Sequence, residues 1–232
     1  MAKKIFIGVG HGGSDPGAVA NGFKEKDLNL AIALACQAEL ARHGISVLMS
    51  RTKDENDTLT DEIKECNAFA PDLAVEIHNN AGGGDGAEVF HTVKGGTGKT
   101  LATDILNEIV KIGQNSRGVK TKTNASGGDY YGFIRQVTAP SVIVECAFVD
   151  NKTDMQIIDT AAEQKAMGVA IAKGVLKTLG IAWKAQTAAT TTTATKGKLF
   201  RVQVGAFSTR ARAEALQKMM KAEGYDAIIV EA

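Results

Sequence analysis

The 232-residue sequence lacks the features that mark several broad classes of protein. No apolar stretch approaches the roughly 18 residues of a membrane-spanning helix, so we expect no membrane contact. The formal net charge is +1, which gives no basic field for nucleic acid, and we expect none as a partner. The first lysines precede only a short apolar run that ends in glycine, so we expect no signal peptide. These absences predict synthesis in the cytoplasm, and action outside the cell would need another route of release.

Cysteine is scarce, because the chain has only Cys36, Cys66 and Cys146. They are far apart, odd in number and form no CxxC pair. We therefore expect reduced, mostly buried thiols, as in cytoplasmic proteins.

What the chain does have is an apolar fraction of 44%, which is ordinary for a globular protein. Apolar runs of strand length alternate with segments of helical periodicity, which predicts an α/β fold with a mostly parallel central sheet and helices on both faces. Sites in such sheets gather at the carboxyl ends of the strands. The predicted strands span 5–9, 45–50, 73–78, 87–92 and 141–146, with a short one near Val119, and the predicted helices span 26–43, 60–70, 100–112 and 155–179, the last with a break near Ala161.

A change in composition divides the chain into three parts. Residues 1–181 form the predicted main domain. Residues 182–198 include AQTAATTTTATK, which has no apolar period and is typical of a linker. Residues 199–232 predict a strand, a helix and a strand. A βαβ unit of this size is small for a stable domain, so we expect half of one.

Two glycine-rich segments resemble nucleotide-binding loops. Gly8–Gly13 satisfies G-x-G-x-x-G after a strand, but a turn follows where a dinucleotide fold needs a helix at once. Gly95–Thr100 ends like a P-loop, but Val93 stands where the first glycine is required. Neither segment favours a nucleotide.

The four histidines differ in their setting. His43 lies at a predicted helix end, which suits a cation, and His91 lies in an alternating strand. His11 and His78 each come at the end of an apolar strand, and Glu25 begins the next helix after His11. Two histidines and a glutamate can bind zinc and leave a fourth position for water. Solvated loop histidines and a helix-start acid are the simpler explanation.

Glu145 stands in the apolar run SVIVECAFVD. A buried carboxylate has a raised pKa, which suits a general base or acid, although a buried ion pair would also explain it. Glu76 shares the face of His78 two residues away and is a candidate for supporting it. Cys146 points to the face opposite Glu145, and a cysteine nucleophile with His78 is the less favoured alternative.

Four blocks, GHGGSDPGA, EKDLN, EIHNN and IVECAFVDN, occur in this order. Together they resemble the zinc-dependent N-acetylmuramoyl-L-alanine amidases of the amidase type 3 family, over roughly residues 3 to 180. Ala147 is a departure, since the family usually has glycine there. The resemblance implies one Zn²⁺ on His11, Glu25 and His78, with Glu145 as the catalytic residue. It also implies that Asn80 and Arg135 contact substrate.

The family hydrolyses the amide between N-acetylmuramic acid and the L-alanine of the stem peptide, so the implied partner is peptidoglycan, and we expect a monomer. The tail resembles the first half of a SPOR domain, a peptidoglycan-binding module. This combination resembles sporulation amidases released by mother-cell lysis and phage endolysins, both of which act on the bacterial cell wall. Two alternatives remain at this point, a non-catalytic wall-binding protein and a zinc peptidase that cuts within the stem peptide.

Overall fold

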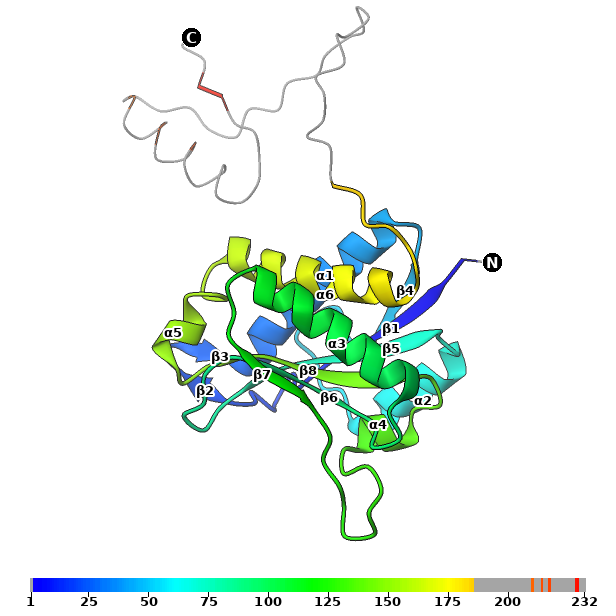
Figure 1. Ribbon diagram of the computed structural model, residues 1–232. Coiled ribbons are helices and arrows are strands. Elements are labelled where there is room, and N and C mark those ends of the chain that lie inside the picture. The colour runs from blue at the N-terminus through cyan, green and yellow to red at the C-terminus, as the bar shows by residue number, and fades with distance from the viewer. Residues whose placement is uncertain (1, 186–209, 211–213, 215–216, 218–227, 230–232) are drawn as a thin grey trace, which may run out of the picture. The chain divides into compact units, whose positions relative to one another are not determined.

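The computed structural model describes residues 2–185 together with residues 210, 214, 217, 228 and 229 (Figure 1). The contacts divide the chain into two compact units, Met1–Trp183 and Lys184–Ala232. Most of the predicted linker at 182–198 and of the predicted βαβ unit at 199–232 lies outside the described residues. The account below concerns the first unit.

Six strands form the central sheet in the order β4-β1-β5-β8-β6-β7. All neighbours run parallel except β6, which runs antiparallel to β8. The predicted mostly parallel sheet is therefore confirmed, with one reversal between its two halves. The strands are β4 (Ser46–Met49), β1 (Lys4–Val9), β5 (Leu73–Asn80), β8 (Ser141–Phe148), β6 (Ala87–His91) and β7 (Ser116–Lys120), and a separate hairpin pairs β2 (Val19–Ala20) with β3 (Phe23–Lys24).

Helices cover both faces of the sheet, as predicted (Figure 1). Three long helices lie on one face, where α6 packs against both α1 and α3. An added Cβ at Gly174 of α6 would lie 2.4 Å from Cα of Ile105, so the helices approach to backbone distance. Two shorter helices lie on the other face. The helices are α1 (Glu25–Arg42), α2 (Leu59–Phe69), α3 (Gly96–Lys111), α4 (Gly132–Gln136), α5 (Lys152–Met155) and α6 (Ala161–Thr178).

The sheet buries its two faces differently. One face belongs to a large apolar cluster shared with α1, α3 and α6. The other face has a small apolar cluster under α2 and α4, around Phe6, Phe90 and Phe133. Side chains alternate along a strand, so Glu76 and His78 of β5 share that second face. Beyond the small cluster this face is polar, and the segment between β7 and α4 projects from the same side (Figure 1).

Three predicted boundaries were wrong. α3 begins at Gly96 and not at residue 100, so the P-loop-like residues form its first turn. β5 and β8 each continue two residues further than predicted. The break predicted near Ala161 is confirmed, because turns at 156–160 separate α5 from α6. No helix in residues 2–185 has the length and apolar character needed to cross a membrane.

Candidate metal centre

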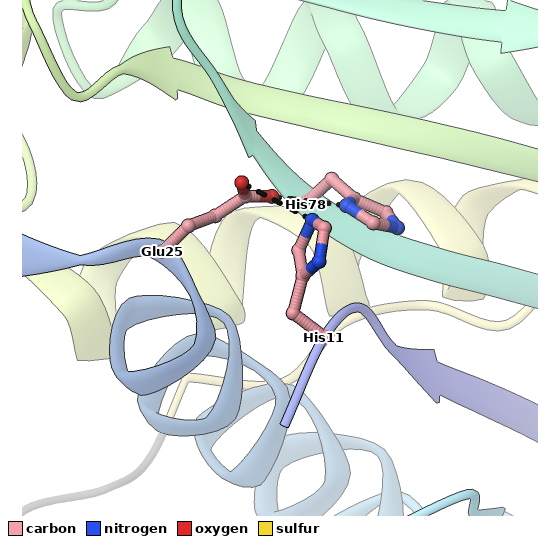
Figure 2. Close-up of side chains that lie close together, drawn as sticks. All are labelled: His11, Glu25 and His78. Atoms are coloured by element: carbon pink, nitrogen blue, oxygen red, sulfur yellow. Dashed lines mark hydrogen bonds and ion pairs between the residues drawn. The ribbon is translucent and has the colours of Figure 1, made fainter. Parts of the chain in front are cut away.

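His11, Glu25 and His78 come together from three separate elements (Figure 2). His11 follows β1, Glu25 is the first residue of α1, and His78 lies in β5. One ligand atom from each lies within 4.8 Å of the other two. Oε1 of Glu25 is 2.9 Å from Nδ1 of His78, and Oε2 is 3.2 Å from Nε2 of His11. The predicted cluster therefore exists in space.

Glycines next to the cluster allow its side chains to approach. An added Cβ at Gly10 would lie 2.2 Å from the imidazole of His78. Gly17 has a φ of +63°, and a Cβ there would lie 2.6 Å from both Glu25 and His11. His11 itself has a φ of 62°, a left-handed conformation that is uncommon outside glycine. The loop thus holds a non-glycine residue under backbone strain at the candidate site.

The Glu25 carboxylate is fixed by groups besides the imidazoles. Its Oε2 accepts a hydrogen bond from the backbone N–H of Ala18 at 3.0 Å. Its Oε1 accepts one from the N–H of Asn79 at 3.1 Å and one from Nδ2 of Asn29 at 3.3 Å. Sequence reasoning missed both asparagines. The available signal was the spacing of Glu25 and Asn29, which are one helical turn apart.

Arg51 is a second feature that sequence reasoning missed. Its side chain is buried and lies beneath the loop that carries His11. Nη2 donates to the carbonyl oxygens of Gly10, at 3.2 Å, and Lys26, at 2.8 Å, and Nε donates to that of Val9. Arg51 therefore ties the end of β1 to the start of α1, and so fixes His11 relative to Glu25.

Each imidazole also meets a carboxylate at its other nitrogen. Nδ1 of His11 is 2.8 Å from Oδ2 of Asp15, and Nε2 of His78 is 3.4 Å from Oε1 of Glu76. Burial alone would lower the pKa of His78, but its hydrogen bonds with Glu25 and Glu76 raise it well above the ordinary value. Burial would likewise raise the pKa of Glu25, and the two imidazoles lower it strongly instead.

This donor set fits one zinc ion. Two imidazole nitrogens and a carboxylate oxygen are ligands that catalytic zinc prefers, and tetrahedral ligation at ~2 Å places ligand atoms ~3.3 Å apart. Each imidazole nitrogen lies close to that spacing from its own oxygen of the Glu25 carboxylate, at 2.9 Å for His78 and 3.2 Å for His11. Carboxylates on the remaining imidazole nitrogens orient metal-binding histidines in many sites.

Glu145 lies beside His78, since the two are register partners on the parallel strands β8 and β5. Its residue is partly exposed, but its Oε2 atom is buried and has no hydrogen-bond partner among the described residues. Burial raises the pKa of Glu145 to about 7, with Glu25, Glu88 and Glu76 adding to the effect and His78 opposing it. A carboxyl group with this pKa can both accept and return a proton near neutral pH.

The two predicted substrate contacts are placed differently. Asn80 lies near Glu145 and donates from Nδ2 to Oε1 of Glu88 at 3.2 Å. Arg135 lies on α4, and its Nη1 donates to the carbonyl oxygens of Asp129 and Tyr130 at 2.9 and 2.7 Å. Among residues 2–185 these are the only hydrogen bonds of the Arg135 side chain, so it braces the segment before α4 and does not join the cluster.

The alternatives to a metal site find no support. Cys146 is fully buried within the large apolar cluster on the opposite face, and burial raises the pKa of its thiol well above the ordinary value. The three cysteines are free and buried, as predicted. The glycines at 95–98 begin α3 and form no open phosphate-binding loop.

Two family models match the chain. The family model for N-acetylmuramoyl-L-alanine amidase matches residues 5–177, and that for the SPOR domain matches residues 171–231. The beginning of the second match falls within α6, whose Ile171 and Val175 belong to the apolar cluster of the first unit.

Individual relatives show the same likeness. N-acetylmuramoyl-L-alanine amidase CwlM of Bacillus licheniformis is 34% identical over 231 residues, covering 98% of this chain and 84% of the relative. The sporulation-specific N-acetylmuramoyl-L-alanine amidase of Bacillus subtilis is 32% identical over the same shares. The solved structure of Cwp6 from Clostridium difficile is 39% identical with a TM-score of 0.76, covering 77% of this chain and 30% of that one. The chain therefore belongs to the N-acetylmuramoyl-L-alanine amidase family.

Proposed function

We propose that this chain hydrolyses the amide bond between N-acetylmuramic acid and the L-alanine of the stem peptide in peptidoglycan, with one zinc ion on His11, Glu25 and His78. The observation that carries the proposal is the position of Glu145 beside this donor set, where its buried Oε2 has no hydrogen-bond partner in the described part of the chain. Family membership supplies the substrate class.

When bound, zinc would act as a Lewis acid that polarises the amide carbonyl and acidifies a water molecule. Glu145 accepts a proton from the attacking water through its carboxylate. Because its pKa is about 7, Glu145 then returns that proton to the nitrogen of the leaving L-alanine. Asp15 and Glu76 hold the imidazoles in the orientation that ligation needs.

Asn80 and Arg135 complete the proposed substrate side. Asn80 donates to Oε1 of Glu88, the register partner of Glu145, and its contact with the stem peptide is part of the proposal. Arg135 acts through the segment it braces, which carries Tyr130. A direct contact of Arg135 with substrate is part of the family expectation and remains a prediction.

The proposed setting is the bacterial cell wall. In this proposal residues 1–181 form the catalytic domain, and residues 182–198 form a linker. Residues 199–232 form a partial SPOR unit that binds glycan strands. The likeness to a sporulation-specific amidase extends over 98% of the chain, tail included, which supports release during sporulation over a phage setting. We propose that the protein acts as a monomer.

The test is digestion of purified peptidoglycan by the zinc-loaded full chain, followed by mass spectrometry. We expect about one zinc per chain and release of intact stem peptides that begin with L-alanine. Glu145→Gln should retain zinc but lose turnover by at least about 100-fold. Absence of new free amines would favour the non-catalytic binding protein, and new termini within the stem peptide would favour the peptidase.

A further inference from the structure

A row of polar side chains crosses the open face of the sheet from the candidate metal centre to its edge. His78 and Glu145 are register partners, and Glu145 is in turn the register partner of Glu88 on β6. Neighbouring strands lie ~4.8 Å apart, so Glu88 lies about one strand spacing from Glu145. The row continues onto β7, the edge strand, which pairs with β6.

Two cations of β7 meet at the buried carboxylate of Glu88. Nε of Arg117 lies 2.7 Å from Oε2 of Glu88, and Lys120 forms an ion pair with the same oxygen. The Glu88 side chain is 7% exposed, whereas those of Arg117 and Lys120 are 35% and 34% exposed. One buried carboxylate needs one counterion, so the set of Glu88, Arg117 and Lys120 carries a net charge of +1, and the two partly exposed cations present that charge to solvent.

The geometry of Arg117 leaves donors for a further anion. Its guanidinium lies over the ring of Phe148, with Cζ 4.8 Å from the ring centroid, which fixes its plane. Within residues 2–185, the hydrogen bond from Nε to Glu88 is the only one that the guanidinium of Arg117 makes. Its terminal nitrogens, Nη1 and Nη2, can therefore both donate to one carboxylate. Lys122, two residues beyond β7, adds a third cation, with Nζ 4.0 Å from the ring centroid of Tyr130.

The opposite side of the metal centre has no such excess. There the loops after β1 and β4 carry more carboxylates than cations. The acids are Asp15, Asp54, Glu55 and Asp57, and the bases are Arg51 and Lys53. Lys26, in the first turn of α1, forms an ion pair with Asp54. An anionic part of the substrate is therefore attracted towards β7, and the neutral glycan is better tolerated beside β1 and β4.

We propose that Arg117 and Lys120 form a subsite for a carboxylate of the stem peptide, and this rests on the proposed amidase function. The distance between neighbouring strands places their charged groups ~5–10 Å from Glu145, which is one to two strand spacings. An extended peptide spans ~3.3–3.6 Å per residue. The subsite therefore meets the second residue after the scissile bond. In peptidoglycan that residue is a glutamate linked through its side chain, and its α-carboxyl group is either free or amidated. The subsite favours the free form.

The experiment compares two soluble muropeptides that differ only in a carboxylate or a carboxamide at that position. For the zinc-loaded full chain we expect kcat/KM about tenfold higher for the carboxylate form, the value of one charge-assisted hydrogen bond. Arg117→Gln and Lys120→Gln should each shrink this ratio through KM, and added salt should shrink it too. Each variant leaves one cation on Glu88, so folding is preserved. Lys99→Gln, on α3, which packs on the opposite face of the sheet, is the matched control and should keep the ratio.

Equal kcat/KM for the two forms in the parent chain would overturn the proposal, as would a ratio unchanged in both variants. Binding of the corresponding free stem peptides, measured by calorimetry, separates this subsite from the amidase function. If neither muropeptide is cleaved but the carboxylate peptide binds in a manner that depends on Arg117 and Lys120, the subsite stands and the amidase function fails. Equal binding of the two peptides would contradict the subsite whatever the activity.

Discussion

The buried Oε2 of Glu145 has no hydrogen-bond partner among the described residues, and the same is true of Oε1 of Glu62 and Oδ1 of Asn79. An unpartnered buried oxygen costs stability, and burial alone already disfavours the charged form. Such a group is retained at a reactive centre because it must exchange a proton during turnover. At the scale of single residues, the site therefore combines a Glu25 carboxylate fixed by hydrogen bonds with a Glu145 oxygen that has none among the described residues.

The first prediction concerns stability of the metal-free protein against pH. The folded pKa of Glu145 is about 7 and its ordinary value is 4.5, so the folded state binds the extra proton between these values. Stability from this group is thus present at low pH and is lost as pH rises towards 7. Relative to the parent chain, Glu145→Gln should gain up to about 3 kcal/mol between about pH 4 and pH 8, at 1.36 kcal/mol per pH unit.

Urea unfolding of both proteins with a chelator present, at several pH values, measures that difference. A stability difference that stays constant across the range would show that Glu145 titrates normally in the folded protein. The sign of the change in this stability difference with pH is informative, because a salt-bridged glutamate with a lowered pKa would give the opposite trend.

A second prediction concerns Glu76 and its buried neighbour Glu62. Glu76 accepts from Nε2 of His78, so Glu76→Gln should weaken zinc binding by about 10- to 100-fold. Burial and the charge of Glu76 raise the pKa of Glu62 well above its ordinary value, which favours its neutral form, and glutamine resembles that form. Glu62→Gln should therefore leave zinc affinity close to that of the parent chain. Competition with a zinc-binding dye measures both, and equal losses in the two variants would refute the orienting role of Glu76.

At the scale of elements, the metal centre depends on how closely β1 approaches β5. Gly10 has an ordinary backbone conformation, yet an added Cβ would overlap the His78 imidazole. Gly10→Ala should thus displace His78 and weaken zinc binding by at least about tenfold, as overpacking shifts side chains. Gly98→Ala is the matched control, since its Cβ would make ordinary contacts at 3.5 Å within α3. Far-UV circular dichroism and zinc titration report on fold and site separately. Unchanged zinc affinity in Gly10→Ala would contradict the close approach.

The sequence was sufficient for the strands and for most of the donor set. Apolar runs that end abruptly locate β1, β5 and β8, and the residues at those ends are His11, His78 and Glu145. Helix α3 was predicted too short because glycines at 96 and 98 have low helix propensity. In the fold, Gly98 is buried against neighbouring backbone, and packing outweighs that propensity. Helix α4 has five residues, which is too few for a periodic signal.

The supporting groups could not be predicted because they depend on strand order. Arg51 reaches the loop after β1 only because β4 is the neighbour of β1. Glu88 faces Glu145 only because β6 enters the sheet antiparallel beside β8. No local pattern in the chain specifies that order. Pairings between distant residues therefore had to come from the structure, and they include the cations of β7.

At the scale of the whole molecule, the catalytic unit closes its core with α6. Val175 and Leu176 are fully buried in that core, although the SPOR family match already begins at residue 171. After α6, Trp183 still contacts the unit, because its ring lies under Lys173 and its Nε1 donates to Glu39. The start of the SPOR family match at residue 171 is therefore not a place where the chain can be divided. The packing puts that boundary after Trp183.

The last prediction follows from that boundary. A chain that ends at Trp183 keeps the core and the metal centre intact, so it should cleave soluble muropeptides with the kcat/KM of the full chain. Its binding to intact peptidoglycan sacculi should be weaker by about tenfold or more, because a linked second binding unit raises the effective affinity. A chain that ends at Ala170 removes Ile171, Val175 and Leu176 from the core and should fail to fold. Pelleting with sacculi and hydrolysis of soluble substrate test the two properties independently. Undiminished pelleting of the Trp183 truncation would mean that residues 184–232 contribute nothing to wall binding, whereas loss of soluble activity would mean that they belong to the catalytic unit.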